Sequence, residues 1–296
     1  MYIIAGASGN TGKIVAHELL SHGKKVKVIG RNAGHLKPLV DKGAKALIGD
    51  LADGSFLKKA FSGAEAAYIL IPPNPKSTDF RAYQKTVSDN YLEAIKSGGI
   101  KYVVLLSSVG AHLRHGAGVI DGLGYLEEKL ATLKDVHVLN LRPSYFMENL
   151  FGQIDIIKRA GIAGSAVKAD IRIPMVASAD IGTVAARRLN DLKFKGHTIE
   201  YVLGPADLTF NEVASVLGKE IGKPDLKYVQ FTYDDAKKAM VGSGYVNENL
   251  ADLYNQMSES FNNGKAMNAH KRTSENSTPT SIQDFAKVFA GAYKSS

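Results

Sequence analysis

A glycine-rich turn near the N-terminus constrains the fold of this chain more than any other feature. The turn directly follows an apolar run, residues 2–5, and opens a helical pattern that extends to residue 22. Small residues in the spacing G-x-x-G-x-x-G let a backbone approach a pyrophosphate, and a helix N-terminus supplies free N–H donors. We therefore expect a strand, a phosphate-binding turn and a helix; the alternative is a tight turn without a ligand. The residues expected to contact a dinucleotide here are Gly6, Ser8, Gly9, Asn10, Thr11 and Gly12.

Strand-like and helix-like segments alternate through the first half of the chain. Near-continuous apolar runs of this length are typical of strands buried on both faces. Helical patterns lie between the runs, at residues 11–22 and 79–96. This alternation predicts an α/β fold with a doubly wound parallel sheet and right-handed crossovers. The predicted strands are residues 2–5, 26–29, 46–48, 67–71, 102–106 and 136–141.

The alternation loosens after about residue 150. One more strand is expected at 199–203, and helices are expected at 209–221 and 282–293, the last capped by Ser281 and Asp284. The polar segment 271–281 is expected to be a surface loop. We therefore predict a Rossmann domain of residues 1–150, rejoined by about 176–204. A smaller, mostly helical C-terminal lobe, drawn from residues 151–296, would cover the crevice at the carboxyl ends of the strands.

Composition excludes several classes of protein. The chain has 296 residues, 45% hydrophobic and 22% charged, which is ordinary for a globular protein. It contains no cysteine, which excludes a disulfide framework, a thiolate zinc site, an iron–sulfur cluster and a cysteine nucleophile. No apolar run approaches the roughly 20 residues that span a bilayer, and the chain does not begin with a signal-peptide pattern. We expect a cytoplasmic protein with no membrane partner.

The net charge and the positions of the histidines indicate which kinds of ligand the chain can bind. The net charge of +8 mildly favours anionic ligands such as nucleotides. The basic residues are dispersed and form no stripe with interleaved aromatics, so we expect no direct nucleic-acid binding. His112 and His115 lie in a glycine-rich loop, 110–118, without a nearby carboxylate or third histidine. No metal site is therefore expected, although His112 is a candidate to line the substrate pocket or donate a proton.

The end of the second predicted strand indicates which cofactor is bound. An NAD site usually carries an acidic residue there, which accepts from the ribose 2′-hydroxyl. This chain has Arg31, whose guanidinium suits a 2′-phosphate; the alternative is a surface arginine. The sequence therefore favours NADPH over NADH. Asp50 and Leu51 follow the third strand and are expected at the adenine, while Ile71 and Pro72 follow the fourth and are expected at the ribose side.

The turn and Arg31, taken together with four later segments, resemble the NmrA-like family, whose members are atypical short-chain dehydrogenases/reductases. The four segments are residues 105–112 (LLSSVGAH), 141–149 (LRPSYFMEN), 179–182 (ADIG) and 208–214 (LTFNEVA). The resemblance implies a Rossmann domain that binds NADP(H) and a small C-terminal lobe. It also places one segment beside the nicotinamide, where packing between the lobes is a compatible role for the aromatic residues. That segment is Pro143, Ser144, Tyr145 and Phe146, with Ser107 nearby.

The pair Tyr125 and Lys129 has the Y-x-x-x-K spacing of a catalytic acid and its partner lysine, with Ser107 or Ser108 as the accompanying serine. In catalytic relatives, however, the tyrosine lies further from the strand that Arg142 ends. The difference is about eight residues, or about 12 Å of helix. Relatives often carry His-x-x-Glu in this helix; Glu127 matches the glutamate and Gly124 stands at the histidine position. Tyr125 and Lys129 thus remain candidates whose alternative is a packed tyrosine and a surface lysine.

Two functions agree with these features. The first is an NADPH-dependent oxidoreductase that transfers a hydride to a quinone-like or other small electrophilic acceptor. The second is a redox sensor that binds NADP(H) without turnover and acts through a regulatory protein partner. Either protein is expected to be a monomer or a homodimer.

Overall fold

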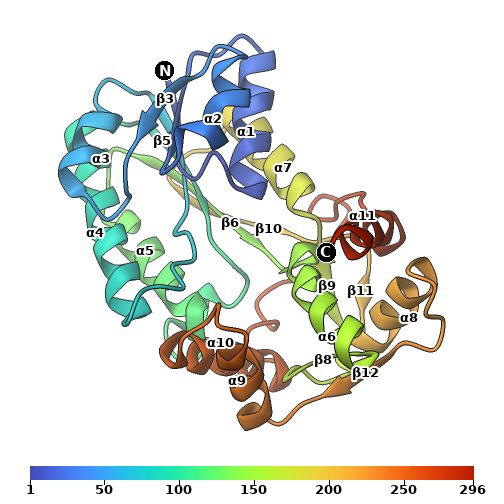
Figure 1. Ribbon diagram of the computed structural model, residues 1–296. Helices are drawn as coiled ribbons and strands as arrows, with labels where there is room; N and C mark the ends of the chain where they lie inside the picture. The colour runs from blue at the N-terminus through green and yellow to red at the C-terminus, as the bar shows by residue number, and fades with distance from the viewer.

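The computed structural model describes residues 1–296 and contains one large parallel sheet (Figure 1). Its seven strands lie in the order β10-β6-β5-β4-β1-β2-β3, and every neighbouring pair is parallel. The direction in which successive strands are added to the sheet reverses between β1 and β4. Open α/β sheets bind ligands at such a reversal, outside the carboxyl ends of the strands. The strands are β1 (Tyr2–Ile4), β2 (Val26–Gly30), β3 (Lys45–Ile48), β4 (Ala66–Ile69), β5 (Tyr102–Leu106), β6 (His137–Pro143) and β10 (His197–Val202).

Helices cover both faces of this sheet. One face packs against α1 (Asn10–Ser21), α2 (Ala33–Val40) and α7 (Ser178–Asp191). The other packs against α3 (Gly54–Phe61), α4 (Phe80–Gly98) and α5 (Asp121–Ala131), as Figure 1 shows. Alternate residues of each strand face opposite layers, so both faces are apolar and both are buried. The predicted doubly wound sheet is confirmed, and all predicted strands and helices end within two residues of their predicted limits.

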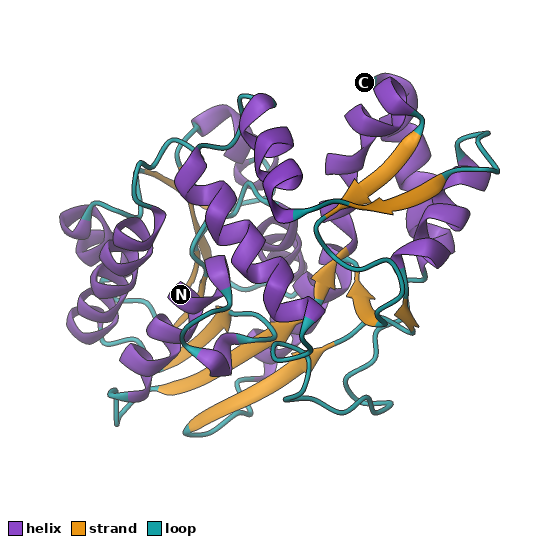
Figure 2. Cartoon of the chain, turned by 90° about the horizontal axis from the view of Figure 1, so that it is seen from below, coloured by secondary structure: helices purple, strands orange, loops and turns teal.

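The C-terminal part of the chain adds a lobe that is mainly helical. Its helices are α6 (Ile154–Ala160), α8 (Phe210–Glu220), α9 (Tyr233–Gly242), α10 (Glu248–Asn262) and α11 (Ile282–Ser295). The lobe also contains two small sheets that lie apart from the main one (Figure 2), and the sequence did not indicate them. The first joins β7 (Tyr145–Phe146), β9 (Ile173–Val176) and β11 (Asp207–Leu208); the second pairs β8 (Ile162–Ser165) with β12 (Lys227–Gln230).

Side-chain caps define where the helices of the lobe begin. Thr209 and Glu212 form a complete capping box at α8, in which each side chain accepts from the other residue's backbone N–H. The predicted cap at α11 is confirmed, because Ser281 Oγ accepts from the Asp284 N–H at 3.1 Å. The segment before α11 is a loop, as predicted, attached to the main sheet by a bridge between Leu203 and Ser277. None of the helices combines the length and apolar character needed to cross a bilayer.

Three 3₁₀ helices shape the edge of the sheet nearest the lobe. They are η1 (Ala111–Leu113), η2 (Gly118–Ile120) and η3 (Met147–Gln153). The connection that contains η1 and η2 is held by Asp121, whose carboxylate accepts from the backbone N–H groups of Gly116 and Ala117. Gly118 has φ +60°, and a Cβ there would collide with the Leu253 carbonyl oxygen, so this connection packs directly on α10.

Candidate active site

A cavity of about 950 Å³ lies at the carboxyl ends of the main strands and extends beneath the C-terminal lobe. Its walls come from the turn after β1, the ends of β2 to β6 and helix α10. The position agrees with the chain reversal between β1 and β4. The predicted cofactor residues that line it are Gly6, Ser8, Gly9, Asn10, Thr11, Arg31, Asp50, Leu51, Ile71, Pro72, Ser107, Ser144, Tyr145 and Phe146.

The glycine-rich turn presents an uncapped helix to the cavity. Gly9 is the N-cap of α1, no side chain accepts from the first N–H groups of this helix, and its first turn has no acidic residue. Gly6 adopts φ +60°, which favours glycine. Free N–H donors and a partial positive charge at a helix N-terminus fit a pyrophosphate. Gly12, also expected to contact the dinucleotide, does not line the cavity. A Cβ there would collide with the Gly6 carbonyl oxygen, so Gly12 packs against the turn.

The end of the cavity beside β2 and β3 carries charge. Arg31 is exposed there and forms no salt bridge within the chain, so its guanidinium is free to meet an anion. The structure adds Tyr83 of α4, which the sequence did not indicate. Burial raises the pKa of Tyr83 to about 12, with a further rise from Asp50 and a partial offset from Arg31. Arg31, Asp50 and Tyr83 all line the same cavity.

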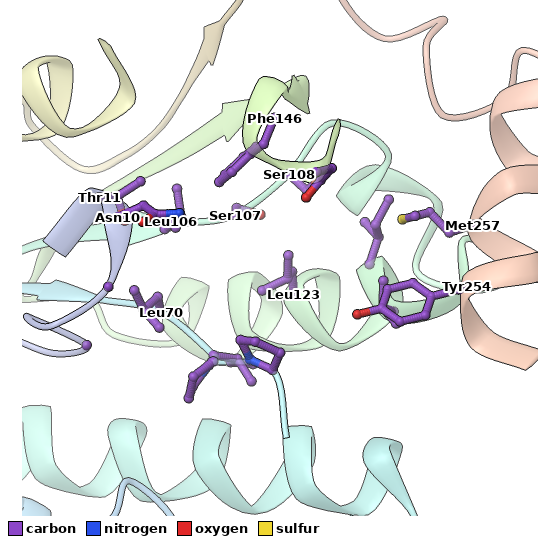
Figure 3. A pocket seen from close by; sticks show the side chains of 18 of the residues that line it. Asn10, Thr11, Leu70, Leu106, Ser107, Ser108, Leu123, Phe146, Tyr254 and Met257 are labelled. Atoms are coloured by element: carbon purple, nitrogen blue, oxygen red, sulfur yellow. The ribbon is translucent and has the colours of Figure 1, made fainter. Parts of the chain in front are cut away.

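The middle of the cavity is lined by residues at or just after the ends of β4, β5 and β6. Leu70, Leu106 and Phe146 flank the centre of the site, and Ser107 and Ser108 lie beside them (Figure 3). Pro143, also expected near the nicotinamide, is the buried last residue of β6 and is not among the residues that line the cavity.

A buried ion pair lies directly behind Ser107. The Arg142 guanidinium donates to Glu127 twice, from Nε to Oε1 at 3.0 Å and from Nη2 to Oε2 at 2.5 Å. The Ser107 hydroxyl donates to Glu127 Oε1 at 2.5 Å, and Arg142 Nη1 donates to the Tyr201 hydroxyl at 3.1 Å. Burial alone would lower the pKa of Arg142, but the hydrogen bonds to Glu127 and Tyr201 outweigh burial, and the pKa is raised. The buried ion pair is thus hydrogen-bonded directly to Ser107, a residue of the cavity wall.

Tyr125 and Lys129 do not line the cavity, and their contacts favour the alternative of a packed tyrosine and a surface lysine. The Tyr125 hydroxyl donates to Asp89 Oδ1 of α4 at 3.0 Å, and Lys129 Nζ lies 3.8 Å from the same oxygen. Helix α5 therefore turns this face toward α4, while Leu123 of the same helix points into the cavity (Figure 3). The distance argument from the sequence, which placed Tyr125 too far along the helix, agrees with this arrangement.

We accordingly expect Tyr125→Phe to change turnover by less than about threefold. The substitution removes only a partly buried hydrogen bond to Asp89, whereas loss of a positioned catalytic acid costs about 10²–10⁴-fold. The measurement is kcat with saturating NADPH, alongside thermal unfolding. A hundredfold fall in kcat with cofactor binding intact would show that Tyr125 is the proton donor after all.

His112, a candidate to line the substrate pocket or donate a proton, is not among the residues that line the cavity. It belongs to η1, and its Nδ1 is buried without a hydrogen-bond partner. Burial lowers the pKa of His112, and the Arg142 cation lowers it further. A direct role for His112 in proton transfer to a ligand is therefore not supported by its position. No cluster of three or more histidine, aspartate or glutamate side chains has the arrangement of a metal site.

The C-terminal lobe closes one side of the cavity with apolar side chains. Tyr254 and Met257 of α10 point into it from the side opposite the turn (Figure 3). Met240 and Phe261 line the same region, together with Tyr145. We call this region, defined by these five residues, the apolar chamber. The sequence analysis expected a covering lobe and Tyr145 near the nicotinamide, but it did not indicate the other four residues. These come from α9 and α10, about 100 or more residues after the strands of the main sheet that they face.

Two hydrogen bonds attach the start of α10 to the segment that connects β4 with α4. The Asn247 side chain donates to the Ser77 carbonyl at 2.6 Å, and the Phe80 N–H donates to Asn249 Oδ1 at 3.0 Å. Phe80 also packs with Leu250 and other apolar residues of α10. These contacts hold α10, which lines the cavity, against the start of α4.

This fold and cavity define a Rossmann-type dinucleotide-binding protein with an apolar chamber beside the cofactor site. Residues 2–286 match the NmrA-like family, and the chain belongs to this family. The expected resemblance is therefore confirmed.

Relatives of the chain include both reductases and a differentiation protein. The Prestalk A differentiation protein A of Dictyostelium discoideum is 24% identical over 96% of this chain and 91% of its own length. Agroclavine dehydrogenase of Claviceps fusiformis is 33% identical over 48% of each chain.

Among solved structures, an Escherichia coli NADPH-dependent quinone oxidoreductase in complex with NADPH has a TM-score of 0.82, 22% identity and coverage of 97% of this chain and 99% of its own. The Citrobacter sp. triphenylmethane reductase in complex with NADP(H) has a TM-score of 0.76, 19% identity and coverage of 98% and 100%. The NADP(H) cofactor and oxidoreductase class expected from the sequence agree with these relatives.

Proposed function

We propose that this protein is an NADPH-dependent oxidoreductase that reduces a quinone-like or other small apolar electrophile. The observation that carries the proposal is a single cavity that joins the uncapped N-terminus of α1 and the free guanidinium of Arg31 to the apolar chamber. The first two features fit a pyrophosphate and a 2′-phosphate. The chamber offers a flat acceptor a water-poor surface beside them.

The residues of the cavity would bind and orient the two reactants. Reduced nicotinamide, when bound, supplies the hydride, and the protein supplies orientation and exclusion of water. Phe146 and Leu70 flank the centre of the site, and the chamber holds the acceptor against it. Ser144 Oγ is buried in the wall without a hydrogen-bond partner, so its hydroxyl is free to bind a ligand oxygen. A conjugated acceptor such as a quinone needs little further proton assistance, since water can complete its reduction.

A second candidate function is a redox sensor that binds NADP(H) and signals to a protein partner. The observation in its favour is the position of Tyr125 and Lys129, both directed to Asp89 and away from the cavity. The usual acid of the superfamily is therefore missing from the site. A sensor would keep the cofactor site and need no acceptor.

An acceptor panel distinguishes the two functions. We expect NADPH oxidation, followed at 340 nm, with small quinones and weaker or no oxidation with aldehydes and azo dyes. The Gly9→Val variant is the control, because it retains the chamber and lacks the cofactor site. NADPH binding without oxidation by any acceptor in the panel would favour the sensor and argue against the reductase.

A further inference from the structure

We infer that Ser107 acts only as a hydrogen-bond acceptor toward the nicotinamide half of the bound cofactor, and that Glu127 and Arg142 are the positioning residues that impose this polarity. The inference rests on the proposed NADPH site. It differs from the role expected for the serine after β5 in catalytic relatives, which donates its hydrogen to a substrate carbonyl.

The single hydroxyl hydrogen of Ser107 is already committed within the protein. A carboxylate has no hydrogen to give, so the 2.5 Å contact between Ser107 Oγ and Glu127 Oε1 requires the serine to donate. Glu127 remains an acceptor because both of its oxygens also receive N–H groups from Arg142. Glu127 is 8% exposed and Arg142 5%, so neither side chain can exchange this partner for solvent.

The lone pairs of Ser107 are left for the cavity. No protein group donates to Ser107 Oγ, although the residue lines the cavity wall and is 3% exposed. Ser144 directly follows the neighbouring strand β6 and is equally buried. Unlike the Ser107 hydroxyl, the Ser144 hydroxyl has no hydrogen-bond partner in the protein. The wall therefore presents one serine that can only accept and one that is free to donate.

The sheet order places Ser107 at the nicotinamide half. The pyrophosphate site follows β1, and Arg31 follows β2 on one side of it. A dinucleotide bound across the switch point extends the other way over β4, β5 and β6, and Ser107 follows β5. The donors that this half of the cofactor offers are the carboxamide N–H groups and the ribose hydroxyls, and an acceptor-only serine suits either.

The first test is calorimetric titration of NADPH into wild type, Ser107→Ala and Ser88→Ala. Ser88 is a matched control, because it is a fully buried serine of α4 that bonds within its own helix and does not line the cavity. We expect Ser107→Ala to weaken NADPH binding about three- to tenfold. Ser88→Ala should leave the affinity unchanged. Unchanged affinity in Ser107→Ala, or a large fall in kcat at wild-type affinity, would overturn the inference.

The second test reverses the polarity of Ser107. The Glu127→Gln amide has two orientations, which its contacts with Arg142 distinguish in a crystal structure of the variant. With the amide nitrogen at Ser107 Oγ, the amide donates, the serine hydrogen turns toward the cavity and a donor faces a donor; we then expect NADPH affinity at or below that of Ser107→Ala, and a double variant Ser107→Ala/Glu127→Gln no weaker than Glu127→Gln alone. With the amide oxygen at Ser107 Oγ, the serine still donates and we expect affinity near that of wild type; wild-type affinity with the nitrogen at Ser107 would overturn the inference. If the two substitutions weaken NADPH binding by independent factors that multiply in the double variant, Glu127 acts only through stability and its positioning role is refuted. If Glu127→Gln does not fold, the Ser107→Ala comparison still decides.

The ligand arm uses the reduced 3-acetylpyridine analogue of NADPH, in which a methyl group replaces the carboxamide nitrogen. A loss in Ser107→Ala that is confined to NADPH supports the carboxamide as the donor, and an equal loss with both ligands supports the ribose. Absence of any loss with either ligand contradicts the inference. Wild-type protein that does not bind NADPH would instead refute the proposed function.

Discussion

Replacement of Gly9 by valine is expected to weaken NADPH binding by at least about a hundredfold, or about 2.7 kcal/mol, while the fold stays intact. Gly9 has φ −83° and ψ 174°, which any residue adopts. A Cβ at this position would meet only the Gly6 carbonyl oxygen, at 3.2 Å. The branched side chain would instead cover the uncapped N–H groups of α1, where the pyrophosphate is expected.

The Gly9 result is measured by NADPH titration together with thermal unfolding. Gly291→Val is the matched control, because Gly291 is an exposed helical glycine outside the cavity, where an added Cβ would meet no atom within 4 Å. Wild-type affinity in Gly9→Val would contradict the assignment of the turn. A large loss of stability in Gly9→Val would show that the turn itself, rather than the ligand, requires the glycine.

Arg31→Ala is expected to weaken NADPH binding about 10- to 100-fold and to leave NADH binding nearly unchanged. The guanidinium has no carboxylate partner in the chain, so its hydrogen bonds are available to a 2′-phosphate. A charged hydrogen bond contributes about 1.5–3 kcal/mol, which corresponds to this range. The measurement is titration of both cofactors into wild type and variant.

Arg159→Ala controls for the loss of a positive charge, since Arg159 is exposed on α6 and away from the cavity. We expect its preference for NADPH to equal that of wild type. Equal affinities of wild type for NADPH and NADH, or an equal loss of both in Arg31→Ala, would show that Arg31 does not recognise the phosphate.

The Rossmann part of the fold could be predicted because its signals are local. Most of the main strands are short apolar runs, and the phosphate-binding turn is one contiguous segment whose neighbours are a strand and a helix. The lobe was harder to predict. Strands β8 and β12 are four residues each and lie far apart in the chain, and their pairing depends on tertiary packing that no local pattern expresses.

The same contrast holds for the candidate site. Arg31, Asp50 and Ser107 follow strands, so the topology alone brings them to one edge of the sheet. Tyr83, Tyr254 and Met257 come from helices, and only the packing of α10 against the start of α4 directs them into the cavity. The role of Glu127 was likewise hidden, because its partners Ser107 and Arg142 lie on two different strand ends.

A single-turnover experiment tests the central claim that one cavity holds both NADPH and its acceptor. Wild-type protein saturated with NADPH is mixed rapidly with excess small quinone, and absorbance at 340 nm is followed for bound cofactor. The account predicts the loss of one equivalent of NADPH per chain, faster than in the absence of protein. Bound NADPH whose absorbance stays constant in the presence of quinone would contradict it.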